Sequence, residues 1–181
     1  LTGARNQFAP GRRAGSRLGG GSRDGQLSVT GPRPAAQWTA GMAAVCLGIA
    51  ASVSPGFLFG ALFVEMREEF HHGDTISGLL VAAFFGASAL LSAPIGRWVD
   101  ERGPDDSLRI GLTAAVALQA LIALVGRSIA AIVVLALAAG VANALCQVSA
   151  NVWIARHVPR DRQGVAFAAK QSSMPAAALL A

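Results

Sequence analysis

Four long stretches of the 181-residue chain carry no charged side chain and are rich in apolar residues. They run from Trp38 to Val64, Ile76 to Ile95, Ile110 to Gly126 and Ser128 to Ala155, with 27, 20, 17 and 28 residues. A helix needs about 20 residues, at about 1.5 Å each, to cross about 30 Å of hydrocarbon. Each stretch is therefore near or above spanning length.

The pattern predicts membrane spans over about 38–64, 76–97, 109–126 and 128–155, and a fifth over 164–181 that the end of the sequence interrupts. A soluble all-α protein holds one such helix at its centre, but four would leave no polar faces to meet water. Only 14% of the residues are charged, against about 25% in soluble domains. We therefore expect an all-α, polytopic membrane helical bundle over residues 37–181, and a sequence that is part of a longer protein.

Residues 1–36 differ from the rest, because six arginines and one aspartate there account for the whole net charge of +5. The segment is rich in Gly, Arg and Ser and has too few large apolar residues to fold alone. It is predicted to be a disordered basic tail, either a tether to anionic lipid headgroups or an extension that only helps orientation. Since the basicity is confined to this tail, we expect no nucleic-acid partner.

The basic residues outside the spans predict the orientation. Twelve lie in the tail, between the second and third spans, or after the fourth span, whereas the other two connections hold only Arg67 and Arg127. Basic residues are retained on the cytoplasmic side, so we expect a multi-pass plasma-membrane protein with a cytoplasmic N-terminus and the lipid bilayer as a partner. The segment EMREEFHHGD is then external, and its histidines, His71 and His72, lack the further ligands that a metal site needs.

Small residues recur at every fourth position in two spans, a spacing that lets helix backbones approach closely in lipid. They are Gly48, Ser52, Gly56 and Gly60 in the first span and Ala136, Gly140 and Ala144 in the fourth. Pro55 and Pro175 are expected to kink their spans and free carbonyls that neighbours or water must satisfy.

Three amides, Asn143, Gln147 and Asn151, lie four residues apart in the fourth span and therefore share one face. An unsatisfied amide in lipid costs several kcal/mol, so this face is expected to point into the bundle. The amides either form hydrogen bonds that join neighbouring helices or line the polar wall of a water-filled substrate path, and we favour the path.

Lys170 is the one charged residue well inside the fifth span. Insertion of a lysine at the centre of a bilayer costs roughly 3 kcal/mol. It is a candidate for anion binding or for responding to a coupling ion, unless its stem snorkels to the headgroups. Gln171 adds local polarity, and we include both residues in the substrate path.

The chain shows no nucleophile with a base, no phosphate loop and no paired carboxylates, so we do not expect an enzyme. Cys46 and Cys146 each lie inside a span, where small apolar packing is the better interpretation. Neither a metal nor a cofactor is expected.

The stretch GRWVDERGPDD places Gly96, Asp100 and Gly103 between the second and third spans. This spacing resembles the loop motif of the major facilitator superfamily, in which glycine, aspartate and glycine are combined with basic residues. Glu101, Asp105 and Asp106 stand where that family usually has basic residues. Arg102 and Arg109 lie nearby as displaced sources of positive charge.

The resemblance covers about residues 37–181 and implies the first four spans and part of a fifth, from a usual twelve in two six-helix halves. It implies transport of a small-molecule substrate by alternating access, coupled to a proton or other ion gradient. Gly96, Asp100, Arg102 and Gly103 would form a cytoplasmic gate motif, with Arg156 as the partner of Asp100. A drug exporter of the same superfamily and a non-transporting structural or sensor subunit are the alternatives.

Overall fold

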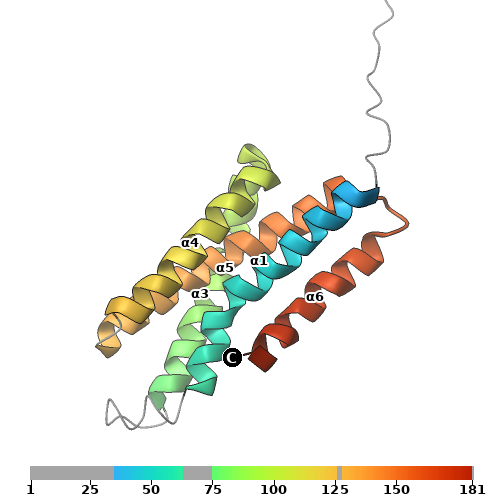
Figure 1. Cartoon of the computed structure of the whole chain (residues 1–181). Coiled ribbons are helices and arrows are strands. Elements are labelled where there is room, and N and C mark those ends of the chain that lie inside the picture. Colours follow the sequence, from blue (N-terminus) through green and yellow to red (C-terminus); the bar gives the residue numbers. More distant parts are fainter. Residues whose placement is uncertain (1–34, 63–74, 126–127, 181) are drawn as a thin grey trace, which may run out of the picture. The chain divides into compact units, whose positions relative to one another are not determined.

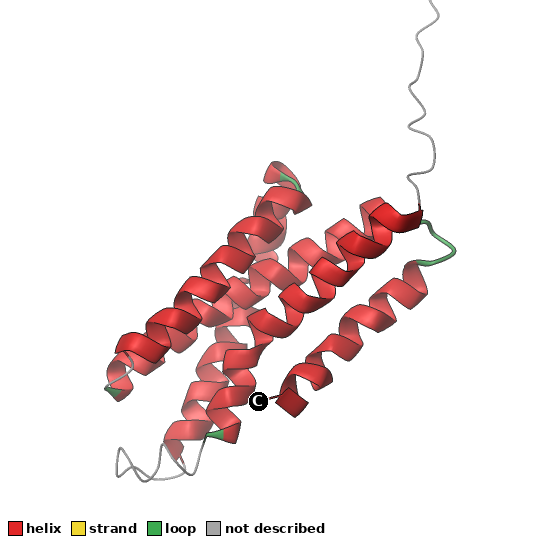
Figure 2. Ribbon diagram, in the orientation of Figure 1, coloured by secondary structure: helices red, strands yellow, loops and turns green. Residues whose placement is uncertain are grey.

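The computed structural model describes residues 35–62, 75–125 and 128–180. Within them, five helices and no strand are found (Figures 1 and 2). The helices are α1 (Ala35–Ala61), α3 (Thr75–Arg102), α4 (Pro104–Val125), α5 (Ile129–His157) and α6 (Gln163–Leu180). The predicted all-α bundle is confirmed. The basic tail up to residue 34, the loop arginines Arg67 and Arg127, and the HHGD segment lie outside the described residues.

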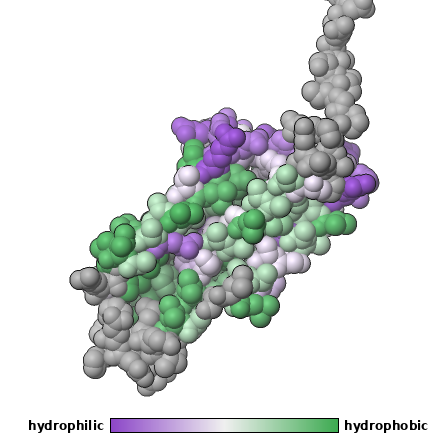
Figure 3. Space-filling view, in the orientation of Figure 1, coloured by the Kyte–Doolittle hydropathy of each residue, from purple (hydrophilic) through white to green (hydrophobic). Residues whose placement is uncertain are grey.

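Four of these helices, α1, α3, α4 and α5, are long and apolar enough to cross a membrane. α6 is shorter, with 18 residues, and its central Lys170-Gln171-Ser172-Ser173 run makes it more polar. Large apolar side chains face outward, including Leu90, Leu124 and Leu179, which are 81%, 74% and 88% exposed (Figure 3). Water would disfavour such a surface, whereas lipid or further helices cover it at no cost. The chain is a multi-pass membrane protein.

Helices α1 and α5 form the centre of the bundle, and each contacts the other four helices (Figure 1). α3 and α4 pack mainly against α5, whereas α6 packs mainly against α1. Fully buried apolar side chains line these contacts, among them Ile49 of α1, Phe84 of α3 and Ile154 of α5. This arrangement brings the amide face of α5 between α1, α3 and α6.

Small residues permit the close approaches, as predicted. A Cβ at Gly140 would overlap the backbone carbonyl of Phe84, where α3 and α5 meet. A Cβ at Gly56 would come within 2.8 Å of the Phe84 ring, and one at Gly48 within 2.6 Å of the Leu112 side chain. The prediction was wrong for Gly60, because no described atom lies within 4 Å of its Cβ position.

The charged stretch between the second and third predicted spans is helical except at one residue, which differs from the expected loop. α3 continues to Arg102, α4 begins at Pro104, and Gly103 alone joins them with a φ of 91°. Glycine accepts this conformation without strain, and proline at the first helical position lacks only an N–H that has no helical partner anyway. Asp105 and Asp106 fall in the first turn of α4, where negative charge favours the helix.

The connection from α5 to α6 is also short, with residues 158–162 between the two helices. α5 starts at an N-cap, where Ser128 Oγ accepts from the Ala131 N–H at 3.2 Å. At its other end Gln163 Nε2 donates to the Ala155 and Val158 carbonyls at 3.1 Å each. The α3–α4 corner and the α5–α6 connection lie at the same end of the bundle (Figure 1). We call residues 96–109 and 153–163 the charged end, which is the hydrophilic region at the top and right of Figure 3.

Candidate functional site

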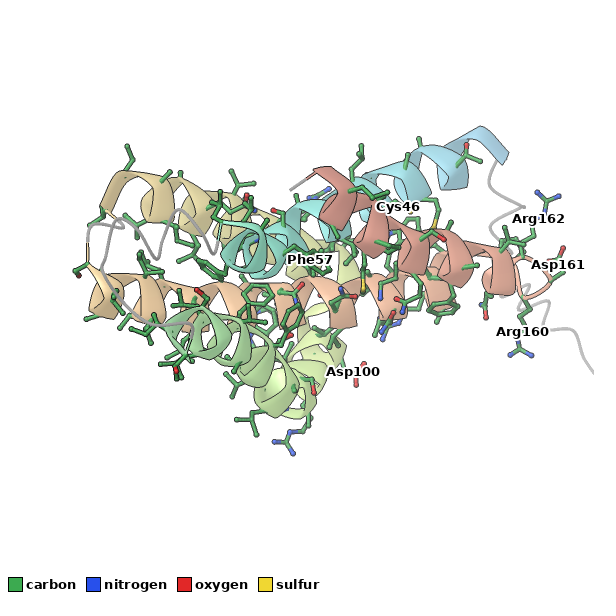
Figure 4. The ribbon with its side chains drawn as sticks, turned by 90° about the horizontal axis from the view of Figure 1, so that it is seen from below. Cys46, Phe57, Asp100, Arg160, Asp161 and Arg162 are labelled. Carbon is green, nitrogen blue, oxygen red and sulfur yellow. The ribbon has the colours of Figure 1, made fainter. Side chains whose placement is uncertain are left out.

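Asp100 and Arg156 meet across the charged end. The Asp100 Oδ1 atom lies 3.7 Å from an Arg156 guanidinium nitrogen, and the two side chains are 69% and 50% exposed. Asp100 projects from the last turns of α3 (Figure 4). Arg156 lies in the last turn of α5. Exposed ion pairs are worth about 0–1 kcal/mol. This contact therefore breaks and re-forms at little cost.

A second link joins α4 to α5 at Asp105. Trp153 Nε1 donates to Asp105 Oδ1 at 3.0 Å, and His157 Nε2 lies 3.8 Å from Asp105 Oδ2. The Trp153 and His157 rings stack with their centroids 4.8 Å apart. Sequence reasoning missed this cluster, although Trp153 and His157 are four residues apart and so lie on one helix face. The acidic residue that departs from the family pattern thus has a structural partner.

The other predicted gate residues have separate roles. The Arg102 guanidinium lies 4.9 Å from the centroid of the Trp98 ring in the same helix, a cation–π contact rather than a bond to Asp100. No described atom lies within 4 Å of a Cβ at Gly96. Gly103 sets the turn. The gate motif is therefore divided between one ion pair and one turn residue.

Asn143 is buried at the centre of the bundle, with 3% of its surface exposed. Its Oδ1 accepts from Ser52 Oγ of α1 at 3.2 Å, and its Nδ2 donates to Ser88 Oγ of α3 at 3.1 Å. These contacts match the interpretation in which the amides form hydrogen bonds between helices, since Asn143 joins α5 to α1 and α3. A place for Asn143 in the substrate path stays a prediction.

The two remaining amides of α5 are increasingly open toward the charged end, since Gln147 is half-buried and Asn151 is exposed. Lys170 of α6 is only 3% exposed, and its Nζ donates to Asn151 Oδ1 at 2.8 Å. The ammonium is thus bonded within the bundle, which favours a polar site over snorkelling, and its place in the substrate path stays a prediction. Gln171 is exposed, and its side chain makes no hydrogen bond within the described residues.

The carbonyl that Pro55 leaves free in α1 has a partner on α4. Pro55 has no N–H, so the carbonyl of Ala51 loses its helical donor. Gln119 Nε2 of α4 donates to that carbonyl at 2.6 Å, and Ser54 Oγ donates to it at 2.9 Å. The expectation that neighbours satisfy a freed carbonyl is confirmed at Pro55. The available signal was Gln119 itself, the one amide in the uncharged run from Ile110 to Gly126.

A family model described as Major Facilitator Superfamily matches residues 39–181, which include all five helices apart from the first turn of α1. The chain belongs to the Major Facilitator Superfamily. No curated protein and no solved structure matches it. The superfamily resemblance inferred from Gly96, Asp100 and Gly103 is confirmed.

Members of the Major Facilitator Superfamily are in general transporters and not enzymes, so the chain is of the membrane-transporter type. The described residues contain no cluster of three or more His, Cys, Asp or Glu side chains that could hold a metal ion. Among the described residues, two groups of polar contacts can be distinguished. One consists of exposed contacts at the charged end, and the other of hydrogen bonds inside the bundle.

Proposed function

We propose that this member of the Major Facilitator Superfamily moves a small solute across the plasma membrane by alternating access. The N-terminus and the charged end face the cytoplasm, as the twelve basic residues on that side favour. The solute binds near the middle of the membrane, between the described half and a second half, as in transporters built from repeats. An ion gradient drives the movement, and no cofactor takes part.

The observation that carries the proposal is the Asp100–Arg156 contact. It joins α3 to α5 at 3.7 Å, and both side chains are open to solvent. A contact of this strength biases one conformation without locking it. Gly103 fixes the turn that follows Asp100. The pair acts as a latch at the cytoplasmic gate and opens when one half rocks against the other.

The path for the solute runs along the open part of the α5 amide face. Gln147, Asn151 and Lys170 contribute its polar groups, and Gln171 lies at its edge. Asn143 joins the path in a second conformation, after its bonds to Ser52 and Ser88 have exchanged.

The test measures uptake by the complete protein in proteoliposomes, with a panel of radiolabelled solutes. Asp100→Asn and Arg156→Gln should each change the uptake rate by up to about fivefold, because the pair is worth at most about 1 kcal/mol. The charge-swapped double variant Asp100→Arg with Arg156→Asp should recover part of the loss. Arg160→Gln, an exposed charge in the same region, is the matched control (Figure 4).

Two results would count against the latch: uptake unchanged in both single variants, or the same loss in Arg160→Gln as in Arg156→Gln. If no solute accumulates in the wild type, the transport proposal itself fails.

A further inference from the structure

Lys170 places a positive charge inside the bundle. It is 3% exposed and shares the inward face of α6 with the buried Ala166 and Ala177. α6 packs against α1, and Figure 4 shows Cys46 on α1 beside α6. A lysine stem at such a site is fixed by packing. The ammonium is therefore held in one place.

No carboxylate within the described residues neutralises this charge. Asp100 pairs with Arg156, Asp105 binds Trp153, and Asp161 lies 3.9 Å from Arg162. The one hydrogen bond that Lys170 Nζ makes is to the neutral amide of Asn151. An ammonium removed from water needs a counter-charge as well as hydrogen bonds. Within the described residues, the one hydrogen-bond partner of the Lys170 ammonium is thus neutral.

The chemistry of lysine fixes the orientation of the Asn151 amide. An ammonium only donates, so the oxygen of Asn151 faces Lys170 and its NH₂ group is turned away. Asn151 is an exposed residue, and its Nδ2 has no hydrogen-bond partner within the described residues. The remaining ammonium N–H groups and this NH₂ group belong to two side chains that are already in contact, so they form a set of nearby donors. Such a set favours an oxyanion.

We propose that Lys170 and Asn151 form the binding site for the negatively charged group of the transported solute, a small carboxylate or phosphate ester. The inference rests on the proposed transport function and names its substrate class. The Asn151 amide holds the ammonium while the site is empty. A bound oxyanion accepts from Lys170 Nζ and from Asn151 Nδ2.

The test measures ligand affinity in the purified complete protein in detergent, by thermal stabilisation, and needs no transport. The probes are matched acid and neutral pairs: benzoate and benzamide, lactate and lactamide, glycerol 3-phosphate and glycerol. At least one acid should bind about tenfold to hundredfold more tightly than its neutral partner, as expected for a charge-assisted hydrogen bond. Lys170→Gln should reduce this ratio to about one, Lys170→Arg should keep it, and Arg160→Gln should leave it unchanged.

Asn151→Asp provides a second variant that does not depend on the removal of Lys170. It places a carboxylate 19 residues before Lys170, at the position that now accepts from Nζ. This built-in anion should abolish acid binding and raise the melting temperature. Acid binding at wild-type affinity in Asn151→Asp would contradict the proposal.

The proposal is rejected if no acid binds the wild type, or if Lys170→Gln keeps the preference for acids. Stabilisation by phosphatidylglycerol, without any by the soluble acids, would identify a lipid site and also reject it. Acid binding through Lys170 without uptake in proteoliposomes would keep the site and reject the transport proposal. Uptake of a neutral solute at the same rate in the wild type and in Lys170→Gln would keep the transport proposal and reject the anion site.

Discussion

The charged end and the interior of the bundle both join α5 to its neighbours through polar side chains, but in opposite surroundings. At the charged end, Asp100 and Arg156 are 69% and 50% exposed. In the interior, Asn143 is 3% exposed and is bonded to both Ser52 and Ser88. Water offers the exposed groups an alternative partner, whereas a buried group that loses its partner keeps the whole desolvation cost. Contacts at the charged end therefore exchange at a lower cost in free energy than those inside.

This difference also separates structural polar groups from functional ones. Gln119 donates to the Ala51 carbonyl and accepts from Ser54 Oγ, both on α1, so its presence in an apolar span is explained by packing. Lys170 is as buried as Asn143 but has only a neutral partner. An incomplete set of partners, rather than polarity itself, is the better guide to a binding site.

The largest expected effect contrasts a glycine from each region. Gly140→Ala should destabilise the complete protein by about 3 kcal/mol, because the new Cβ meets the backbone carbonyl of Phe84, which cannot move aside as a side chain can. Gly96→Ala at the charged end meets no described atom within 4 Å and should gain about 0.5–1 kcal/mol from helix propensity. Thermal unfolding in detergent measures both. Equal changes in stability in the two variants would contradict the expected difference between the interior and the charged end.

A middle-sized effect tests the persistence of an interior contact. Gln119→Ala should cost about 1 kcal/mol, since it removes one of two donors to the Ala51 carbonyl. In a Pro55→Ala background the cost should fall by about half, because the N–H restored at position 55 bonds to the same carbonyl. A double-mutant cycle on unfolding free energies measures this coupling. Strict additivity of the two substitutions would show that Gln119 does not replace the helical donor that Pro55 lacks.

The smallest effect is expected from the exposed pair. Arg156→Gln and Asp100→Asn should each lower the free energy of unfolding by less than about 1 kcal/mol. The effect should shrink as salt is raised, since the Debye length is about 8 Å at physiological ionic strength. Denaturation at low and high salt measures it. A salt-independent loss above about 2 kcal/mol would show that the pair behaves like an interior contact.

The number and class of the helices were predictable from sequence because uncharged runs report directly on burial in lipid. The ends of the helices were not predictable from these runs. Gly103 and Pro104 allow α3 to end and α4 to begin within the charged stretch between the two spans. The adjacency of Asp100 and Arg156 was expected from the superfamily motif. The Lys170–Asn151 contact was not expected, because the sequence does not show how α5 and α6 pack against each other and which of their side chains meet.

The one-residue junction at Gly103 has a mechanical consequence. A longer linker would absorb motion of one helix before the other followed, but a single residue leaves almost no slack between α3 and α4. Displacement of the α3–α4 corner must then strain the Asp100–Arg156 contact and the Asp105–Trp153 contact together. We therefore expect the two weak contacts of this corner with α5 to break together rather than one after the other.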